Sequence, residues 1–231
     1  MNTKIFCDIA DIDLIKKFNK KEIVKGFTTN PSLIRKAGAK DYLTYSKKIL
    51  KITNKPISFE VFADNEKDMI FQGLKITQLG KNVFVKVPVT NSRGRFMGKV
   101  IKELNSNGVK LNITAVYTAK QTAQILSQIN KKTKVIISIF SGRMGDKGKD
   151  PVPEVEKSIN FSKKFKNVQI LWASTREPYN FIQAKQLGCH IITVPPSIIE
   201  KIEKFGSSFK KLTMDTVKGF LLDSKKSKFK I

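Results

Sequence analysis

Three charged residues stand inside segments of the sequence that are otherwise almost entirely apolar. Lys86 lies in Val-Phe-Val-Lys-Val-Pro-Val, Glu60 lies in Ser-Phe-Glu-Val-Phe, and Asp8 lies in Ile-Phe-Cys-Asp-Ile-Ala. Burial of an unpaired charge is costly, so such groups are paired, neutralised or functional. For any one of them, a structural ion pair or a strand end that reaches solvent is an equally good explanation. Three cases at matching depths of their segments favour one shared functional site.

A lysine amine beside two carboxylates is suited to Schiff-base chemistry. Burial and neighbouring cations favour the neutral form of an amine, and the neutral form is the nucleophile. The amine can attack a ketone while a carboxylate carries the protons. The residues therefore predict an enzyme in which Lys86 bonds to a carbonyl substrate, with Asp8 and Glu60 beside it.

The charged segments belong to a longer alternation of short apolar runs with helical patterns such as Asp64–Leu79, Thr118–Ile129, Pro153–Phe165 and Glu177–Leu187. The expected strands are Lys4–Ala10, Val24–Asn30, Ile57–Phe62, Val83–Val89, Lys110–Tyr117, Lys134–Phe140, Val168–Thr175 and His190–Pro195. Runs that are apolar on both faces are typical of a parallel sheet. Eight strands, each followed by a helix, predict an α/β fold, a single (β/α)8 TIM barrel. A doubly wound sheet is the rival fold, but it would usually carry a G-x-G-x-x-G turn, and the sequence has none.

A further helical pattern follows the barrel. We expect one domain, with the catalytic barrel over residues 1–206 and a C-terminal helix and basic tail over residues 207–231. The pattern Leu212–Asp223 puts Val217 and Leu221 on one face, and the basic segment Ser224–Ile231 follows it. Because a barrel interior has no room for an extra helix, this one must pack outside its own barrel or on a neighbouring copy.

Amide and hydroxyl side chains fall where two of the strands should end. Thr28, Thr29 and Asn30 close one strand, although an Asn-Pro pair is also ordinary chemistry for a strand end and a helix start. Asn112 and Thr114 are two residues apart, so they share one face of their strand. The carboxyl ends of barrel strands converge on one pocket, and substrates rich in hydroxyl groups need such partners.

Two arginines follow late strands, where barrel enzymes often bind phosphate. Arg143 lies in Ile-Phe-Ser-Gly-Arg-Met-Gly, and Arg176 lies in Ala-Ser-Thr-Arg-Glu-Pro. Each alone would be weak evidence, because an exposed loop arginine is often only solvated. The loop Gly142–Lys149 is not a P-loop, because its spacing is one residue too long and Asp150 replaces the required Ser or Thr.

The net charge of +25 raises the question of polyanion binding. The 44 Lys and Arg residues include only five arginines, and the lysines are scattered along nearly every expected helix. Nucleic-acid readers favour arginine interleaved with aromatic residues. We therefore expect solvated lysines and no nucleic-acid partner, while a polyanion-binding protein on an inactive barrel is the alternative from a different class.

Few residues could hold a metal ion or form a disulfide. The only histidine, His190, cannot build the multi-histidine zinc site of a metal-dependent aldolase. Asp8, Asp11 and Asp13 could suggest magnesium, but Asp11 is better explained as a helix cap. The two cysteines sit in apolar stretches, as reduced thiols do. With no signal peptide and no membrane-spanning run, we expect a cytoplasmic protein without a membrane partner.

At this point the motifs resemble those of a known family. Gly-Phe-Thr-Thr-Asn-Pro-Ser-Leu-Ile at 26–34 resembles the transaldolase signature, and Val-Lys-Val-Pro-Val-Thr at 85–90 resembles the Schiff-base strand of small transaldolases and fructose-6-phosphate aldolases. The similarity runs in order from Asp8 to Pro195. It implies a TIM barrel enzyme of the pentose phosphate pathway.

The resemblance also implies roles for residues. Lys86 would form the imine with the ketose C2 carbonyl, and Asp8 would carry the proton of the C4 hydroxyl during carbon–carbon cleavage. Glu60 and Thr114 would hold the water of imine formation and hydrolysis. The implied substrate-binding residues are Thr28, Asn30 and Asn112 around the three-carbon fragment, Ser138 and Phe140 in the pocket wall, and Arg143, Ser174 and Arg176 at the phosphate.

Two activities occur in the family. The aldolases usually carry Gln at the position of Glu60 and Tyr at that of Phe140, so this chain looks like a transaldolase. Thr175 and Ser141 depart from the residues typical beside the phosphate site. The resemblance implies transfer of a dihydroxyacetone unit from sedoheptulose 7-phosphate or fructose 6-phosphate to glyceraldehyde 3-phosphate or erythrose 4-phosphate, without metal or cofactor. It also implies a homo-oligomer, pentameric or decameric, and the alternative activity is release of free dihydroxyacetone.

Overall fold

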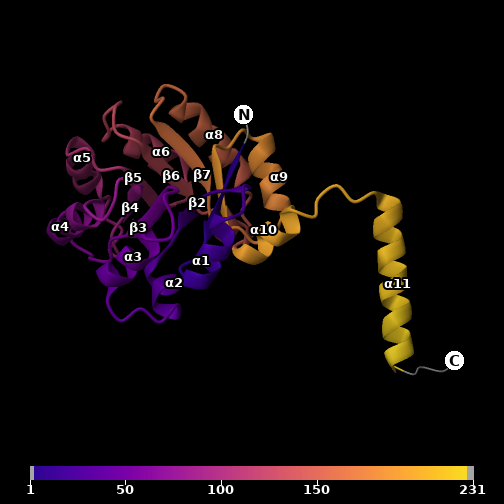
Figure 1. Cartoon of the computed structure of the whole chain (residues 1–231). Helices are drawn as coiled ribbons and strands as arrows, with labels where there is room; N and C mark the ends of the chain where they lie inside the picture. Colours follow the sequence, from indigo (N-terminus) through magenta and orange to yellow (C-terminus); the bar gives the residue numbers. More distant parts are fainter. Residues whose placement is uncertain (1–2, 228–231) are drawn as a thin grey trace.

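A computed structural model describes residues 3–227 of the chain, and these residues form a closed barrel of eight parallel strands in chain order (Figure 1). The strands are β1 (Lys4–Asp8), β2 (Val24–Thr28), β3 (Ile57–Glu60), β4 (Val83–Pro88), β5 (Leu111–Val116), β6 (Val135–Ile139), β7 (Val168–Trp172) and β8 (Ile191–Val194). Each strand pairs with the next, and β1 closes the ring against β8. The predicted TIM barrel is confirmed.

All eight predicted strands are present, but each is shorter than predicted at one or both ends. The lost residues are mainly at the carboxyl ends, where the chain leaves the ladder to build loops. The second strand, for example, ends at Thr28 because Asn30 already caps the next helix by accepting a hydrogen bond from the Leu33 N–H at 2.9 Å. Apolarity extends past the ladder because these loops are still packed against the core.

Helices lie around the barrel, and one more helix follows it in the chain (Figure 1). They are α1 (Ile12–Asn19), α2 (Pro31–Lys36), α3 (Tyr42–Leu50), α4 (Glu66–Thr77), α5 (Gly98–Ser106), α6 (Ala119–Leu126), α7 (Ser141–Gly145), α8 (Val152–Ser162), α9 (Tyr179–Gln186), α10 (Pro196–Ile202) and α11 (Phe209–Ser227). Side-chain caps start several of them. Asp11 accepts from the Leu14 N–H at 2.8 Å, which confirms its predicted role as a cap.

Two apolar layers lie on opposite sides of the barrel wall. The larger fills the space between the strands and the helices. The smaller lies inside the barrel and consists of Phe6, Phe84, Ile136, Leu171, Ala173 and Ile191. Because side chains alternate along a strand, the position two residues after Phe6 also points inward, and that position is Asp8. The polar residues at the carboxyl ends of the strands therefore lie next to this interior layer, which we call the apolar floor.

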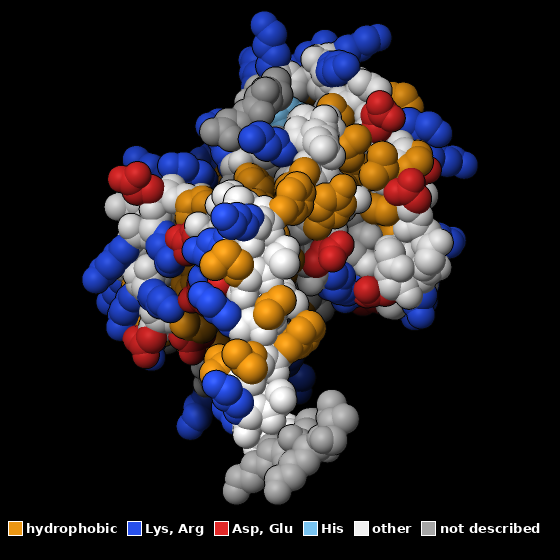
Figure 2. Space-filling model, turned by 90° about the vertical axis from the view of Figure 1, so that its right-hand side faces the viewer, with side chains coloured by type: hydrophobic (Ala, Val, Ile, Leu, Met, Phe, Trp, Pro, Cys, Tyr) orange, Lys and Arg blue, Asp and Glu red, His pale blue; other side chains and the backbone are white. Residues whose placement is uncertain are grey.

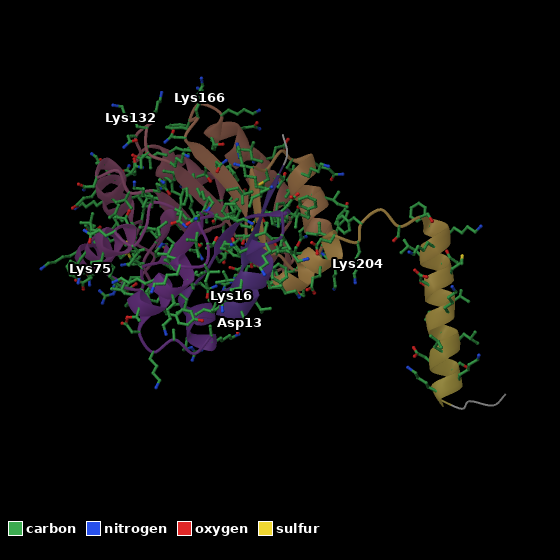
Figure 3. The ribbon with its side chains drawn as sticks, viewed as in Figure 1. Asp13, Lys16, Lys75, Lys132, Lys166 and Lys204 are labelled. Carbon is green, nitrogen blue, oxygen red and sulfur yellow. The ribbon has the colours of Figure 1, made fainter. Side chains whose placement is uncertain are left out.

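The basic side chains are distributed around the outside of the molecule. In Figure 3 the labelled Lys75, Lys132 and Lys166 point away from the barrel, Lys75 on one side of the molecule and Lys132 and Lys166 together on another. This placement matches the scattered pattern in the sequence. Within residues 3–227, every helix is too short or too polar to cross a membrane.

Helix α11 stands apart from the barrel, at the end of an extended connection (Figure 1). It covers the predicted Leu212–Asp223 and continues for about one turn at each end. Its exposed apolar side chains are Phe209, Leu212, Met214, Val217, Phe220, Leu221 and Leu222, and they gather along the helix in Figure 2. The start of the predicted basic tail is helical, and residues 228–231 lie outside the described residues.

Candidate active site

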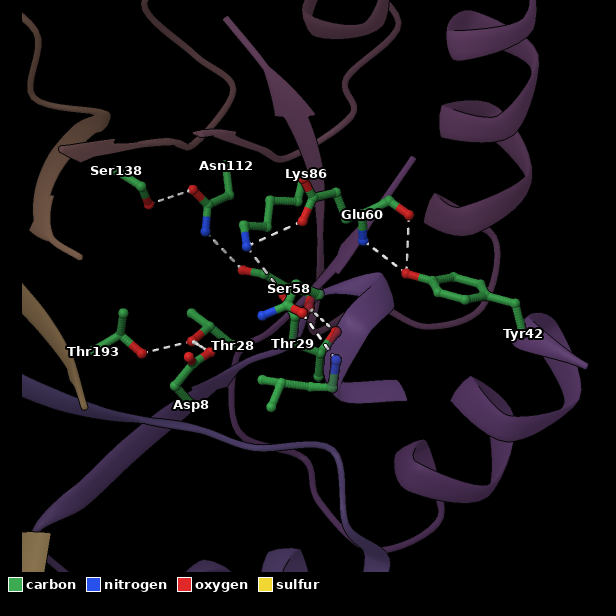
Figure 4. A network of polar contacts seen from close by, with 12 residues as sticks. Asp8, Thr28, Thr29, Tyr42, Ser58, Glu60, Lys86, Asn112, Ser138 and Thr193 are labelled. Carbon is green, nitrogen blue, oxygen red and sulfur yellow. Dashed lines mark hydrogen bonds and ion pairs between the residues drawn. The ribbon is translucent and has the colours of Figure 1, made fainter. Parts of the chain in front are cut away.

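Lys86, Glu60 and Asp8 come together at the carboxyl end of the barrel, with Lys86 beside Glu60 and Asp8 across from them (Figure 4). Glu60 and Lys86 are register partners on β3 and β4, and the Lys86 Nζ lies 3.2 Å from the Glu60 Oε2. The same Nζ donates to the Thr29 carbonyl at 3.1 Å. Lys86 is only 7% exposed, so this is a buried amine held by two oxygen atoms and not a surface ion pair.

Asp8 lies across the pocket in a hydroxyl network. Thr28 donates to the Asp8 Oδ1 at 2.7 Å, and its hydroxyl also lies 2.5 Å from that of Thr193. Burial raises the pKa of the Asp8 carboxyl above its ordinary value of 3.8, while the Lys86 charge and the Thr28 hydrogen bond oppose that rise. A carboxyl group with a raised pKa takes up a proton more readily than an exposed one.

A second chain of polar side chains runs beside the amine (Figure 4). Ser138 donates to the Asn112 Oδ1 at 2.7 Å, and the Asn112 amide donates to the Ser58 hydroxyl at 3.0 Å. Asn112 is fully buried. Asn112 thus pairs in register with Lys86 and has both ends of its amide bonded to protein, while Ser138 lines the pocket.

The end of β5 is irregular where it borders the pocket. The register with β6 shifts between Ile113 and Val116, and Ala115 has a φ of 58°, which is unusual for a residue with a side chain. The preceding Thr114 hydroxyl is buried, lines the pocket and has no hydrogen-bond partner among residues 3–227. Strained backbone and an unsatisfied hydroxyl at one point are typical of a functional site.

Phe140 and Arg143 close one side of the pocket. Phe140 follows β6 and packs edge-on against Tyr117, with ring centroids 5.9 Å apart. The Arg143 guanidinium lies over the Phe140 ring, 5.2 Å from its centroid. The aromatic ring therefore orients the arginine at the mouth of the pocket.

Arg176 is held by a carboxylate that the sequence did not single out. Its Nε donates to both Asp146 oxygens at 3.0 Å, and its second terminal nitrogen donates to Oδ2 at 2.6 Å. Arg176 lowers the pKa of Asp146 below its ordinary value. A further bond joins Arg176 to the Ser174 carbonyl at 3.1 Å, and Ser174 has a φ of 62°. The guanidinium is thus oriented before any substrate arrives.

The two arginine loops touch at Gly142. A Cβ atom there would overlap the Ser174 carbonyl oxygen, so only glycine allows the loops to approach this closely. The close approach brings Arg143 and Arg176 to the rim of the same pocket. Two arginines on one rim can bind a phosphate through charge-assisted hydrogen bonds.

Most of the predicted site residues meet in this cavity of about 200 Å³. Its lining includes Asp8, Thr28, Asn30, Lys86, Thr114, Ser138, Phe140, Arg143, Ser174 and Arg176. Glu60 and Asn112 are not among its lining residues. Thr193 also lines the cavity. The sequence could have predicted this position, because Thr193 comes two residues after Ile191, which points into the barrel. Among residues 3–227, no group of three or more His, Cys, Asp or Glu side chains could hold a metal ion.

Two solved structures share the barrel fold of this chain. A 4-hydroxy-tetrahydrodipicolinate synthase from Methylacidiphilum fumariolicum SolV matches with a TM-score of 0.61 at 9% identity, covering 86% of this chain and 69% of the other. An orotidine 5'-monophosphate decarboxylase from Metallosphaera sedula matches with a TM-score of 0.57 at 12% identity, covering 87% and 95%. At these identities the likeness shows the barrel fold alone.

Sequence comparison is more specific. Probable transaldolases from Thermoanaerobacter sp. (strain X514) and Clostridioides difficile are 33% and 35% identical over 202 residues, which cover 87% of this chain and 89% of each relative. One from Nitrosopumilus maritimus is 34% identical over 203 residues, covering 86% of both chains. The model of the family described as Transaldolase/Fructose-6-phosphate aldolase matches residues 5–231. The chain therefore belongs to the transaldolase/fructose-6-phosphate aldolase family.

Proposed function

We propose that this protein is a transaldolase that forms a Schiff base through Lys86 and transfers a dihydroxyacetone unit between sugar phosphates. The observation that carries the proposal is the buried amine of Lys86, which lies 3.2 Å from a Glu60 carboxylate oxygen in a pocket that also contains Asp8. A structural ion pair would explain Lys86 and Glu60 alone. It would not explain why Lys86 lines a polar cavity rimmed by two arginines.

In the proposed reaction, the Lys86 amine adds to the C2 carbonyl of the ketose, and loss of water gives a protonated imine. The Asp8 carboxylate then takes the proton of the C4 hydroxyl, the C3–C4 bond breaks, and its electron pair moves to the imine nitrogen. The aldose phosphate leaves, and an enamine remains on Lys86. The raised pKa of Asp8 supports this role, because the group must hold a proton between half-reactions.

The second half-reaction reverses these steps with a different aldehyde. The enamine carbon attacks the acceptor carbonyl, Asp8 returns its proton to the new hydroxyl oxygen, and water hydrolyses the imine. Glu60 and the Thr114 hydroxyl hold that water, a role supported by the unpaired Thr114 hydroxyl and by the position of Glu60 beside the amine. The imine nitrogen is the electron sink, so the proposal needs no cofactor.

Substrate binding follows from the remaining lining. Asn30, whose amide oxygen caps α2, keeps its amide NH₂ group for a hydroxyl of the three-carbon fragment, and Thr28 and Ser138 stand beside it. Arg143, Arg176 and Ser174 receive the phosphate at the rim. The cavity is small enough to enclose the reacting end of a sugar while the phosphate stays at the mouth.

Borohydride trapping tests the proposal directly. Incubation with fructose 6-phosphate and borohydride should reduce the imine and leave a stable adduct, which peptide mass spectrometry should place on Lys86. The Lys86→Met variant should remain unlabelled. An adduct on another lysine, or none at all, would overturn the proposed mechanism.

The alternative activity is that of a fructose-6-phosphate aldolase, which the family description also names. Transfer is favoured by Phe140, which cannot hydrogen-bond a water that would protonate the enamine. Adding erythrose 4-phosphate should therefore speed glyceraldehyde 3-phosphate release from fructose 6-phosphate by at least about tenfold, or roughly 1.4 kcal/mol of barrier. Rapid release of free dihydroxyacetone without an acceptor would assign the protein to the aldolases.

The proposal extends to assembly. The exposed apolar side chains of α11 have no cover from the barrel, and we expect the helix to dock on an adjacent copy within a ring of subunits. The double replacement of Val217 and Leu221 by lysine should therefore reduce the mass measured by light scattering. An unchanged mass would mean that α11 does not hold copies together.

A further inference from the structure

The hydrogen-bond ladder between β2 and β3 breaks at its last step. The Phe27 N–H donates to the Pro56 carbonyl at 2.8 Å, and the Thr29 N–H donates to the Ser58 carbonyl at 3.1 Å. In a parallel ladder the next bond of this series runs from the Glu60 N–H to the Thr29 carbonyl. Neither group makes that bond here, and both find other partners.

Tyr42 takes the place of the missing strand bond. Its hydroxyl accepts a hydrogen bond from the Glu60 N–H at 2.8 Å and donates to the Glu60 carbonyl at 2.9 Å (Figure 4). Tyr42 is the first residue of α3, and its ring packs edge-on against Phe62 with centroids 5.4 Å apart. Burial raises the pKa of the Tyr42 hydroxyl far above neutrality, so the group keeps the proton that it donates.

The Thr29 carbonyl is thereby left for the reactive amine. It accepts the hydrogen bond from the Lys86 Nζ at 3.1 Å. The Thr29 peptide is fixed on its other side, because both its N–H and its hydroxyl donate to the Ser58 carbonyl, at 3.1 and 2.8 Å. The amine of Lys86 therefore sits between the Thr29 carbonyl and the Glu60 carboxylate.

From this exchange of partners we infer that Tyr42 is a positioning residue for the Schiff-base lysine. It replaces the ladder bond that would otherwise occupy the Thr29 carbonyl, and it fixes the backbone of the residue whose carboxylate faces Lys86. If the Tyr42 hydroxyl is removed, the Glu60 N–H can recover a partner by bonding to the Thr29 carbonyl. Regular strand pairing and the contact to Lys86 then compete for one oxygen atom. This inference rests on the proposed function of Lys86.

The same helix provides a matched control. Tyr45 also buries part of its ring and donates its hydroxyl to backbone carbonyls, those of Ala10 at 3.1 Å and Ala37 at 3.4 Å. Neither carbonyl hydrogen-bonds with Lys86 or Glu60. Tyr42→Phe and Tyr45→Phe both delete one hydroxyl from α3, so thermal unfolding of the two variants measures the shared loss of stability.

Imine formation is the first measurement. The rate of borohydride trapping at Lys86 with fructose 6-phosphate should fall about ten- to hundredfold in Tyr42→Phe, because the amine is no longer held in one place. It should stay near that of the unmodified protein in Tyr45→Phe. Equal rates in both variants, or losses that only follow their melting temperatures, would overturn the inference. Absence of trapping in the unmodified protein would instead refute the proposed function.

A second measurement needs no substrate. Competitive acetylation with acetic anhydride, read by mass spectrometry across a range of pH, reports how readily each lysine reacts. In Tyr42→Phe the labelling curve of Lys86 should differ from that of the unmodified protein, because the Thr29 carbonyl no longer holds the amine. The curves of surface lysines should not move, and Tyr45→Phe should leave Lys86 unchanged. A Lys86 curve that is the same in all three proteins would contradict a positioning role for Tyr42.

Discussion

The two ends of the barrel both contain lysine, yet only one of them is equipped for chemistry. At the amino end, a cavity of about 760 Å³ is lined by Lys4, Lys25, Lys110 and Lys134, with Glu22 as its acidic residue. The cavity at the carboxyl end has about a quarter of that volume and contains a single lysine, Lys86, together with a carboxylate and hydroxyl groups. The cavity at the amino end is larger and more basic, but it is less suited to catalysis.

The difference lies in how each amine is held. Lys110 donates to the Lys81 carbonyl at 2.6 Å and lies 6.0 Å from the Phe84 ring, beside open solvent. Lys86 is buried between two oxygen atoms and faces a second carboxyl group across the pocket. A solvated amine remains an ammonium ion, whereas a buried amine among proton carriers can become a nucleophile. Partners and burial, more than the number of charges, separate the two ends.

The largest expected effect comes from deleting one lysine at each end. Lys86→Met should reduce transaldolase turnover by at least about a thousandfold, because the covalent step is lost. Lys110→Met should leave turnover within about twofold of the unmodified enzyme. Steady-state assays with fructose 6-phosphate and erythrose 4-phosphate make the comparison. A similar loss in both variants would show that the amino end also serves the reaction.

Removing either of the arginines proposed to bind phosphate should have an intermediate effect on activity. Arg143→Ala or Arg176→Ala should weaken transition-state binding of phosphorylated substrates by about 1.5–3 kcal/mol each, which is the scale of a charge-assisted hydrogen bond. Reactions of unphosphorylated dihydroxyacetone should change little. Lys134→Ala, which removes a cation from the amino end, should affect neither. Arginines that matter equally for both kinds of substrate would be structural.

A single added hydroxyl should have a smaller effect, and only at the carboxyl end of the barrel. Phe140→Tyr should raise the acceptor-independent release of dihydroxyacetone by about two- to tenfold, because a phenol can hold the water that protonates the enamine. Phe84→Tyr adds the same group to the amino-end cavity and should not change product release. Chromatographic measurement of free dihydroxyacetone distinguishes the two variants, and an unaltered rate in Phe140→Tyr would remove this explanation of transfer.

The smallest effects concern stability and have opposite signs. The pKa of Asp8 is raised by burial, so its contribution to stability is present below about its ordinary value of 3.8 and is lost as pH rises. Asp8→Asn should therefore increase the free energy of unfolding at pH 8 and not at pH 4. Arg176 lowers the pKa of Asp146, so Asp146→Asn should be slightly destabilising at pH 8. Denaturant titrations at both pH values would show whether the signs differ.

The sequence allowed prediction of the barrel and of the charged centre because both follow periodic rules. Strands covered on both faces are continuously apolar, so a charge such as Lys86 is conspicuous, and alternation says which way it points. The predicted strand ends were wrong by a few residues, because hydrophobicity does not indicate where strand pairing stops and a loop begins. The substrate-binding role of Asn112 stays a prediction, and in the structure its side chain is fully buried and bonds to Ser58 and Ser138.

The residues that sequence analysis missed act through contacts between distant segments. Tyr42 reaches Glu60 from a helix that starts 18 residues earlier in the chain, and Asp146 reaches Arg176 across 30 residues. Nothing in the local sequence marks them, because a tyrosine at a helix start and an aspartate in a charged loop are both ordinary. Only the closed barrel brings these partners together.

The apolar floor of the barrel affects the order in which the first product leaves and the acceptor binds. Phe6 fills the space over Gly26, where a Cβ would lie 2.5 Å from the Phe6 Cζ, and the other floor residues are buried around it. The pocket is therefore closed at its inner end, and substrates and products enter and leave through the single opening at the carboxyl end of the barrel. Under the proposed chemistry, the first aldose phosphate must depart before the acceptor can enter. Double-reciprocal plots of initial rate against donor concentration at several acceptor concentrations should then be parallel. The first product should be a competitive inhibitor with respect to the acceptor.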